Sequence, residues 1–199
     1  MNAESIVQPQ DPILIDVPRE LAGPHVLLAA PQLGLGAEMA LAITQSLDHL
    51  KPWMPWAQDA PTAESAEAVV RRMHADFVTR RDLCFHVFAL AGDGRRGRLL
   101  GGTGLHRIDW AVRKFEIGYW LRPELQGQGL ASECVQLLCK MAFDALRARR
   151  VEIRCDTRNT RSRAVAERCG FELEGVLRRE SLGVDGEPRD TAVYARIEA

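Results

Sequence analysis

Residues 115–156 hold a strand, a glycine-rich turn, a helix and a second strand in succession, and this order constrains the fold most. The run 115–121 alternates apolar and other residues, which indicates a strand. Apolar residues then recur at helical spacing over 130–145, and a second apolar strand covers 151–156. Two strands joined by a helix pair in parallel through a right-handed crossover. The turn is therefore expected at the carboxyl end of a strand, where α/β sheets bind ligands.

The turn itself consists of Gln126, Gly127, Gln128, Gly129, Leu130 and Ala131. A glycine-rich turn before a helix offers unpaired backbone N–H groups at the positive end of the helix dipole, which suits a pyrophosphate. A plain strand-to-helix turn would also explain the glycines. The spacing of Gly127 and Gly129 lets a ligand approach the backbone, and Ala131 keeps the first helical turn uncrowded. Both features favour an anion site.

Before and after this unit, the sequence predicts one mixed α/β domain over residues 25–199. Four prolines before residue 25 exclude a long helix, so residues 1–24 are expected to form an arm with a short extended piece near 13–17. Strands are predicted over 25–30, 83–90, 98–109, 114–121, 151–156, 171–178 and 190–197. Helices are predicted over 36–50, from an N-cap at Thr62 to Phe77, and over 129–147 and 160–169.

Residues 92–97 match the pattern GxGxxG and follow a strand. A dinucleotide site would require a helix to begin there, because the helix N-terminus holds the pyrophosphate. Another strand follows instead, and Asp-Gly between apolar runs is typical of a hairpin. We therefore interpret this segment as a hairpin turn.

Three motifs in order carry a family resemblance: Gly118-Tyr119-Trp120-Leu121, Gln126-x-x-Gly129-x-Ala131, and Asn159-Thr-Arg-Ser162 followed by the run 164–175. The second resembles the coenzyme A pyrophosphate loop of the GNAT acyltransferase superfamily. Together, over residues 25–197, they resemble the RimJ/RimL-type branch of ribosomal-protein N-terminal acetyltransferases. The resemblance implies a single GNAT-like domain whose mostly antiparallel sheet contains a splayed central parallel pair, with helices on both faces.

The resemblance also implies roles in binding acetyl-CoA. Residues 126–131 would hold the pyrophosphate, and Asn159 and Ser162 would face the pantetheine arm and its sulfur. Capping of a helix by Asn159 is compatible with that position. A backbone N–H near Trp120 or Leu121 would hold the acetyl carbonyl and stabilise the oxyanion.

One departure from the family concerns the leaving thiolate. Many members have a tyrosine seven residues after the asparagine, and Ala166 stands there in this chain. Ser162 is the candidate that donates a hydrogen bond to the thiolate instead.

The general base is a separate question. Glu116, on the strand face shared with Trp120, is the leading candidate, and Glu180 and His106 are further ones. A solvated strand carboxylate would equally explain Glu116.

Trp53 and Trp56 lie in the proline-broken segment after the first helix, where GNAT folds bind the acceptor. They either form a wall of that groove or fill space beneath the loop.

Composition excludes several other classes. A formal net charge of −1 without a basic stripe argues against a nucleic acid partner. No run approaches the roughly 18 apolar residues of a membrane span. The histidines lack metal-ligand spacing, so no metal is expected. Five cysteines without a CxxC pair, and no secretory segment, indicate the cytoplasm.

The resulting hypothesis is an acetyl-CoA-dependent N-acetyltransferase that acylates a primary amine directly, such as the N-terminal amine of a ribosomal or other protein. A polyamine or aminoglycoside acceptor is an alternative. A coenzyme A-binding module without turnover is another, because Ala166 replaces the tyrosine. By analogy with the RimL-like branch, a homodimer is expected.

Overall fold

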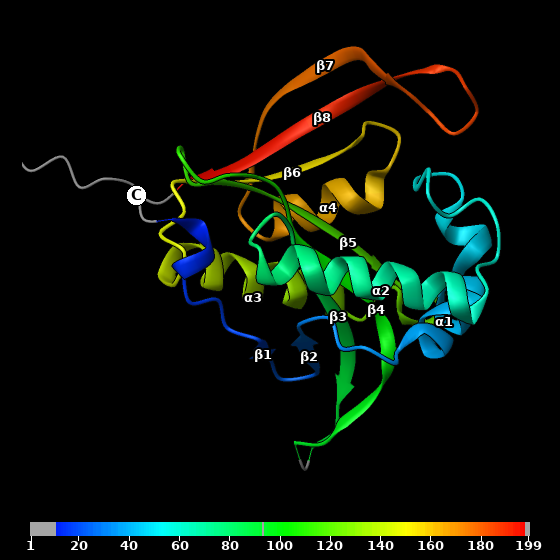
Figure 1. Ribbon diagram of the computed structural model, residues 1–199. Helices are drawn as coiled ribbons and strands as arrows, with labels where there is room; N and C mark the ends of the chain where they lie inside the picture. Colours follow the sequence, from blue (N-terminus) through cyan, green and yellow to red (C-terminus); the bar gives the residue numbers. More distant parts are fainter. Residues whose placement is uncertain (1–10, 93, 198–199) are drawn as a thin grey trace, which may run out of the picture.

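The computed structural model describes residues 11–92 and 94–197, which form one mixed sheet with helices on both faces (Figure 1). Within these residues the strand order is β1-β2-β3-β4-β5-β6-β8-β7. The strands are β1 Glu20–Ala22, β2 Val26–Ala29, β3 Leu83–Leu90, β4 Arg96–Asp109, β5 Lys114–Leu121, β6 Arg150–Asp156, β7 Glu172–Leu182 and β8 Pro188–Ile197. The helices are α1 Gly36–Leu50, α2 Ala63–Val78, α3 Leu130–Asp144 and α4 Thr160–Arg168, with short 3-10 turns at Pro12–Leu14 and Pro123–Leu125. The predicted single α/β domain is confirmed.

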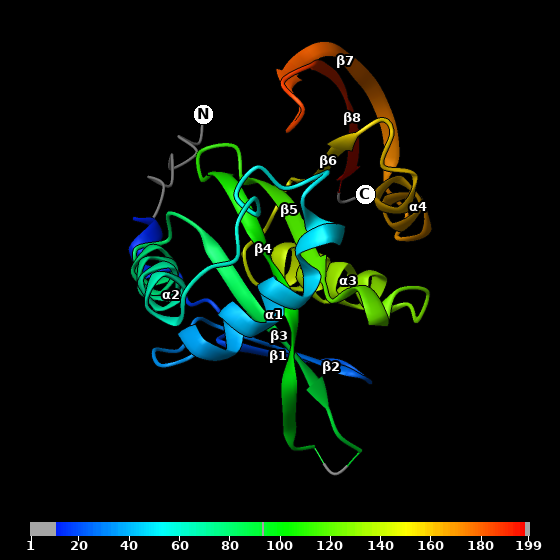
Figure 2. The ribbon, with the colours of Figure 1, turned by 90° about the vertical axis from the view of Figure 1, so that its right-hand side faces the viewer.

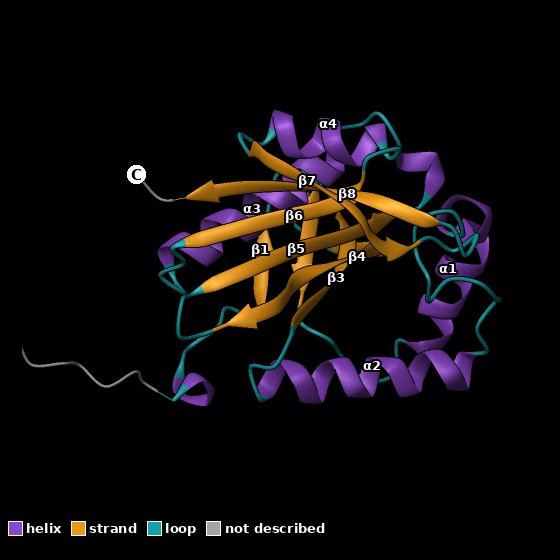
Figure 3. Cartoon of the chain, turned by 90° about the horizontal axis from the view of Figure 1, so that it is seen from above, coloured by secondary structure: helices purple, strands orange, loops and turns teal. Residues whose placement is uncertain are grey.

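The helices form two layers on opposite faces of the sheet (Figures 2 and 3). One apolar cluster joins the buried face of α3 to the centre of the sheet. A second, smaller cluster packs α1 and α2 on the other face, around Phe88 and Leu99. The apolar residues of each helix recur every three or four positions, which places them on the side that contacts the sheet.

The central parallel pair is short and then splays apart. Strands β5 and β6 pair only over residues 114–116 and 150–152. Beyond this ladder β5 continues to Leu121 and β6 continues to Asp156, but the two strands no longer pair with each other. Each strand keeps its antiparallel neighbour, β4 or β8, so the gap opens inside the sheet. The predicted splayed pair is confirmed.

Hairpin chemistry at residues 92–97 is also confirmed, because β3 leads directly into β4 there. The Ala91 N–H bonds the Arg95 carbonyl, and Gly94 has a positive φ of 78°. Residue 93 lies outside the described part of the chain.

The segment before residue 25 differs from the expectation. The extended piece expected near 13–17 is a 3-10 turn at Pro12–Leu14, which begins at a proline whose fixed φ suits a helical turn. The chain becomes extended later, in β1, which pairs with β2. Ile15 and Val17 are buried in the main cluster, so this part of the expected arm packs on the domain.

No helix among the described residues is long and apolar enough to cross a membrane.

Candidate active site

The turn between β5 and α3 leaves its backbone open. Gly127 and Gly129 have φ values of 76° and 80°, a left-handed conformation that glycine adopts at no steric cost. Gly129 is the N-cap of α3 and provides no side-chain cap, so the first N–H groups of the helix keep their hydrogen-bonding capacity. A Cβ built at either glycine would meet nothing within 4 Å, so a ligand can reach this backbone.

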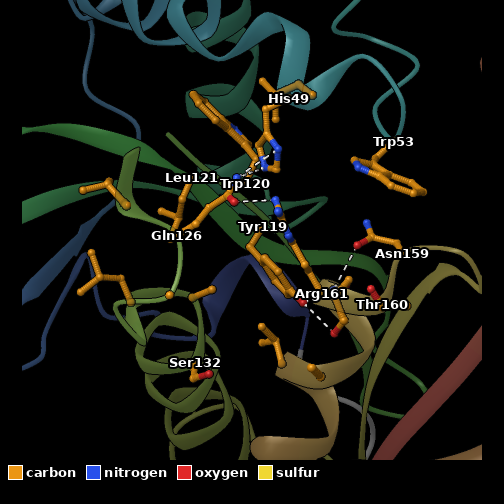
Figure 4. A pocket seen from close by; sticks show the side chains of 18 of the residues that line it. His49, Trp53, Tyr119, Trp120, Leu121, Gln126, Ser132, Asn159, Thr160 and Arg161 are labelled. Atoms are coloured by element: carbon orange, nitrogen blue, oxygen red, sulfur yellow. Dashed lines mark hydrogen bonds between the residues drawn. The ribbon is translucent and has the colours of Figure 1, made fainter. Parts of the chain in front are cut away.

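A cavity of about 1060 Å³ lies between the end of β5, the start of α4 and this turn (Figure 4). The expected site residues that line it are Trp53, Trp120, Leu121, Gln126, Gly127, Gly129, Leu130, Ala131, Asn159 and Ser162. Gln128 is not among the lining residues; it is exposed, and its side-chain amide donates to the Glu124 carbonyl at 3.2 Å.

Backbone alternation decides which amide of β5 faces the gap. The Arg122 N–H bonds the Leu100 carbonyl of β4 at 2.9 Å. Because N–H groups alternate in direction along a strand, that of Trp120 also points to β4 and that of Leu121 points into the gap. Of the two amides suggested by the sequence, the structure therefore favours Leu121.

The start of α4 reaches across the gap to β5. Asn159 is the N-cap, and its Oδ1 accepts the Ser162 N–H at 3.1 Å. The Ser162 hydroxyl lies 2.9 Å from the phenol oxygen of Tyr119. Burial raises the pKa of Tyr119, so this phenol stays protonated near neutral pH. A protonated phenol on β5 therefore holds the hydroxyl of Ser162, on α4, in place.

Gln126 connects three parts of the cavity mouth (Figure 4). Its side-chain nitrogen lies 3.1 Å from His49 Nδ1 at the end of α1, and its oxygen accepts from Arg161 of α4. Burial and the nearby Arg161 charge lower the pKa of His49, so its imidazole is neutral near pH 7. Arg161, Arg158 and Arg168 all line the cavity, which favours an anionic ligand.

A second cavity of about 580 Å³ lies on the other side of β5, between the sheet and helices α1 and α2. It shares Met54, Tyr119 and Trp120 with the first cavity. Trp56 lines this second cavity and contacts Trp120 edge to face, with 6.0 Å between ring centroids. The two indoles of the α1–α2 connection are thus divided, with Trp53 beside one cavity and Trp56 beside the other.

The profile of the acetyltransferase (GNAT) domain family matches residues 27–172. The chain belongs to the GNAT acetyltransferase family. It is 32% identical over 163 residues to YdaF of Bacillus subtilis (strain 168), whose name places it provisionally among ribosomal N-acetyltransferases; the match covers 80% of this chain and 84% of YdaF.

Two solved GNAT structures share the fold closely. The microcin C7 self-immunity acetyltransferase MccE, in complex with acetyl-CoA and AMP, has a TM-score of 0.80 at 25% identity, covering 88% of this chain and 94% of that one. RimJ of Mycobacterium smegmatis, in complex with a CoA disulfide, has a TM-score of 0.79 at 27% identity. The match covers 90% of this chain and 88% of RimJ. RimJ and YdaF together support the RimJ/RimL-type branch.

Glu116, the expected base of this GNAT enzyme, is half-buried and lines neither cavity. Burial raises its pKa, and its carboxylate lies 3.6 Å from Arg107 Nε. Glu180 accepts hydrogen bonds from Arg154 and Thr191 and also lines neither cavity. Of the expected bases, only His106 lines one, the second cavity.

Among the described residues, one cluster brings together side chains of types that ligate metals: Asp82, Cys84 and His106. Asp82 accepts hydrogen bonds from both of the others, which accounts for the cluster without an ion. That no metal is required stays a prediction.

Tyr119, His49 and Arg161 are among the site residues that the sequence analysis missed. Tyr119 belongs to a recognised motif, but only the fold shows that its phenol meets Ser162. Arg161 lies inside the asparagine motif but was given no role. Its position two residues after the N-cap would have placed it near the cavity mouth.

Proposed function

We propose that this GNAT enzyme uses acetyl-CoA to acetylate a primary amine directly, and that the amine is the N-terminus of a ribosomal or other protein. The observation that carries the proposal is the cavity of about 1060 Å³ that runs from the glycine turn along the splayed end of β5 to the start of α4. MccE, which is similar in fold, binds acetyl-CoA by its description. The name of YdaF supports a ribosomal-protein acceptor.

In this proposal the N–H groups at residues 127–131 bind the pyrophosphate, because they lie at the positive end of α3. Gln126 is held by His49 and Arg161 at the same mouth, and the Arg161 charge adds to the attraction. Gln128 contributes through its backbone alone, since its side chain points to Glu124.

Asn159 and Ser162 face the pantetheine arm and its sulfur. The Leu121 N–H, directed into the gap, donates to the thioester oxygen as negative charge develops there. Ser162, positioned by Tyr119, donates to the departing thiolate. This arrangement replaces the family tyrosine whose position is Ala166.

The second cavity receives the acceptor, between Trp56 and Trp120. An α-amino group titrates at about 7.7–8.0, so an N-terminal amine is substantially neutral near pH 8 and needs little help to react. Glu116, whose burial raises its pKa, is the base proposed from the sequence. A homodimer, by analogy with the RimL-like branch, and a cytoplasmic location, from the cysteine usage, complete the proposal.

The decisive experiment measures thiol release from acetyl-CoA with a panel of peptides, a polyamine and an aminoglycoside, after calorimetry with coenzyme A. Binding together with release on peptides that have a free N-terminus, and none on N-blocked peptides, supports the proposal. Release only on the small amines would move the acceptor to that class. Tight binding with no release on any acceptor would leave a binding module.

A further inference from the structure

Three neighbouring strands arrange their residues in rows on the sheet face that lies under α1 and α2. The register aligns His86 with Gly102 and Trp120, aligns Cys84 with Gly104 and Gly118, and aligns His106 with Glu116. Alternate residues of a strand share a face, so these side chains point the same way. Three of the positions are glycine, and we call Gly102, Gly104 and Gly118 the glycine floor.

Side chains that lie over the glycine floor leave no room for a Cβ atom at its three positions. A Cβ at Gly118 would come within 3.0 Å of His106 Nε2, and a Cβ at Gly104 within 3.1 Å of His106 Cε1. At Gly102 it would come within 2.8 Å of Trp120 Nε1. The His106 imidazole therefore lies over the floor at one end, and the Trp120 indole lies over it at the other.

Asp82 fixes the orientation of this imidazole. His106 Nδ1 lies 2.8 Å from Oδ2 of Asp82 and 3.1 Å from its Oδ1. Because a carboxylate only accepts hydrogen bonds, Nδ1 of the neutral ring carries the proton. The Nε2 atom is then the acceptor, and it lies against Gly118 on the side away from Asp82.

Cys84 holds Asp82 in turn. Its thiol donates to Asp82 Oδ1 at 3.0 Å, and burial together with the Asp82 charge raises its pKa, so the thiol remains a donor. The side chains of His106 and Asp82 are 32% and 29% exposed, so a molecule in the second cavity can reach the imidazole.

We propose that His106, oriented by Asp82, is the general base that removes the proton from the acceptor amine. This inference rests on the proposed function, since it needs an acetyl transfer in the neighbouring gap. Gly118 and Trp120 are two residues apart on β5, a distance of about 7 Å along a strand. That span places an amine, or an amine and one water, between Nε2 and the backbone next to Leu121.

The step balances with the groups at hand. The amine nitrogen bonds to the thioester carbon, and the carbon–sulfur bond breaks with its electron pair going to sulfur. The N–H proton passes to His106 Nε2, directly or through one water, and the imidazolium forms beside the Asp82 carboxylate. Ser162 donates a hydrogen bond to the thiolate, which takes a proton from solvent after release. The imidazolium then returns its proton to solvent.

Glu116 has a supporting place in this arrangement. It is aligned with His106 across the β4–β5 ladder, so its carboxylate adds to the attraction that Asp82 exerts on an imidazolium. The other titratable groups near His106 are Cys84 of β3 and the adjacent Arg107. Four more line the second cavity: Asp59, Arg72, His86 and Tyr119.

The test compares His106→Gln, Asp82→Asn and Glu116→Gln in the full chain, using a peptide acceptor that the wild type acetylates. His106→Gln is expected to lower kcat/KM roughly 100-fold, the usual contribution of a general base, and to abolish the acidic limb of its pH profile. Asp82→Asn is expected to lower kcat/KM less, because the imidazole keeps its Nε2 but loses the carboxylate that orients it. Coenzyme A affinity should be unchanged in all three variants.

His25→Gln is the matched control, because His25 also pairs with a carboxylate, Glu133, at 2.9 Å, and it lines neither cavity. If His106→Gln keeps the wild-type rate and acidic limb, the inference is wrong. It is also wrong if Glu116→Gln alone removes the limb. Loss of coenzyme A affinity or of thermal stability in both His106→Gln and Asp82→Asn would assign the pair a structural role. A wild type that neither binds coenzyme A nor acetylates any acceptor would instead refute the proposed function.

Discussion

The two cavities on either side of β5 are built on different principles. At the first cavity, residues 127–131 present consecutive backbone N–H groups, and the two glycines of the turn face open space. The second cavity, the proposed acceptor site, has contributions from α1, α2 and three strands, and its glycines lie in tight contact with side chains. A site made from one backbone segment depends on little beyond local conformation and charge. A site made from side chains on several strands depends on strand register and packing.

The largest effect is expected from a charge placed on the cofactor turn. Gly129→Asp puts a carboxylate at the N-cap that faces the proposed pyrophosphate, and like charges in contact cost several kcal/mol. Coenzyme A affinity should fall roughly 1,000-fold, or about 4 kcal/mol. Calorimetry with coenzyme A measures this directly.

Gly186→Asp is the control for this substitution, because Gly186 has a φ of 78° in the β7–β8 turn and a Cβ there would meet nothing within 4 Å. It should bind coenzyme A like the wild type. Gly129→Ala separates backbone strain from charge and should lose far less affinity than Gly129→Asp. Unchanged affinity in Gly129→Asp would remove the cofactor turn from the site.

Next in size is the sensitivity to acid that His86 gives the second cavity. His86 is 1% exposed, and neither ring nitrogen has a hydrogen-bond partner among the described residues. Burial lowers its pKa from 6.5 to about 4. The protonation of His86 therefore has little effect on folding stability above pH 6.5. As the pH falls from 6.5 toward 4, only the unfolded chain takes up the proton, so the free energy of unfolding decreases.

Lowering the pH from 7.5 to 5 should reduce the free energy of unfolding by about 2 kcal/mol because of His86. Urea unfolding at the two pH values measures the loss, and His86→Leu should lose that much less than the wild type. His25→Gln, a change at an exposed histidine, should not alter the difference. An equal loss in the wild type and His86→Leu would show that His86 is protonated in the folded state.

The sequence located the elements around the glycine turn well and the side-chain contacts of the second cavity poorly, for one physical reason. Strand β5, the glycine turn and the cap at Asn159 are local patterns, so periodicity and turn chemistry locate them. The Asp82–His106 pair joins residues 24 apart, and strand register alone brings them together. The Tyr119–Ser162 contact spans 43 residues for a similar reason. Strand β1 was missed because three residues are too few to show a period.

A smaller effect is expected where the two cavities meet. Ser162→Ala removes the proposed donor to the thiolate and should lower kcat roughly 10-fold, the order of one hydrogen bond to a charged group. Tyr119→Phe leaves the serine in place without its partner and should cost less. Steady-state kinetics on the two variants measures both values. A larger loss in Tyr119→Phe than in Ser162→Ala would make the phenol the principal donor.

The smallest effect should come from a single methyl group on the glycine floor. In Gly118→Ala the new Cβ would lie 2.9 Å from His106 Cδ2, and the ring, held by Asp82, must move by a few tenths of an ångström. Because a misplacement of 1 Å costs about 100-fold, this shift should lower kcat roughly 5-fold. Coenzyme A affinity should not change, in contrast to Gly129→Asp.

Gly175→Ala is the control, since a Cβ at Gly175 of β7 meets nothing within 4 Å. If Gly118→Ala reduced coenzyme A affinity as much as kcat, the two cavities would behave as one site, and the division across β5 would be wrong.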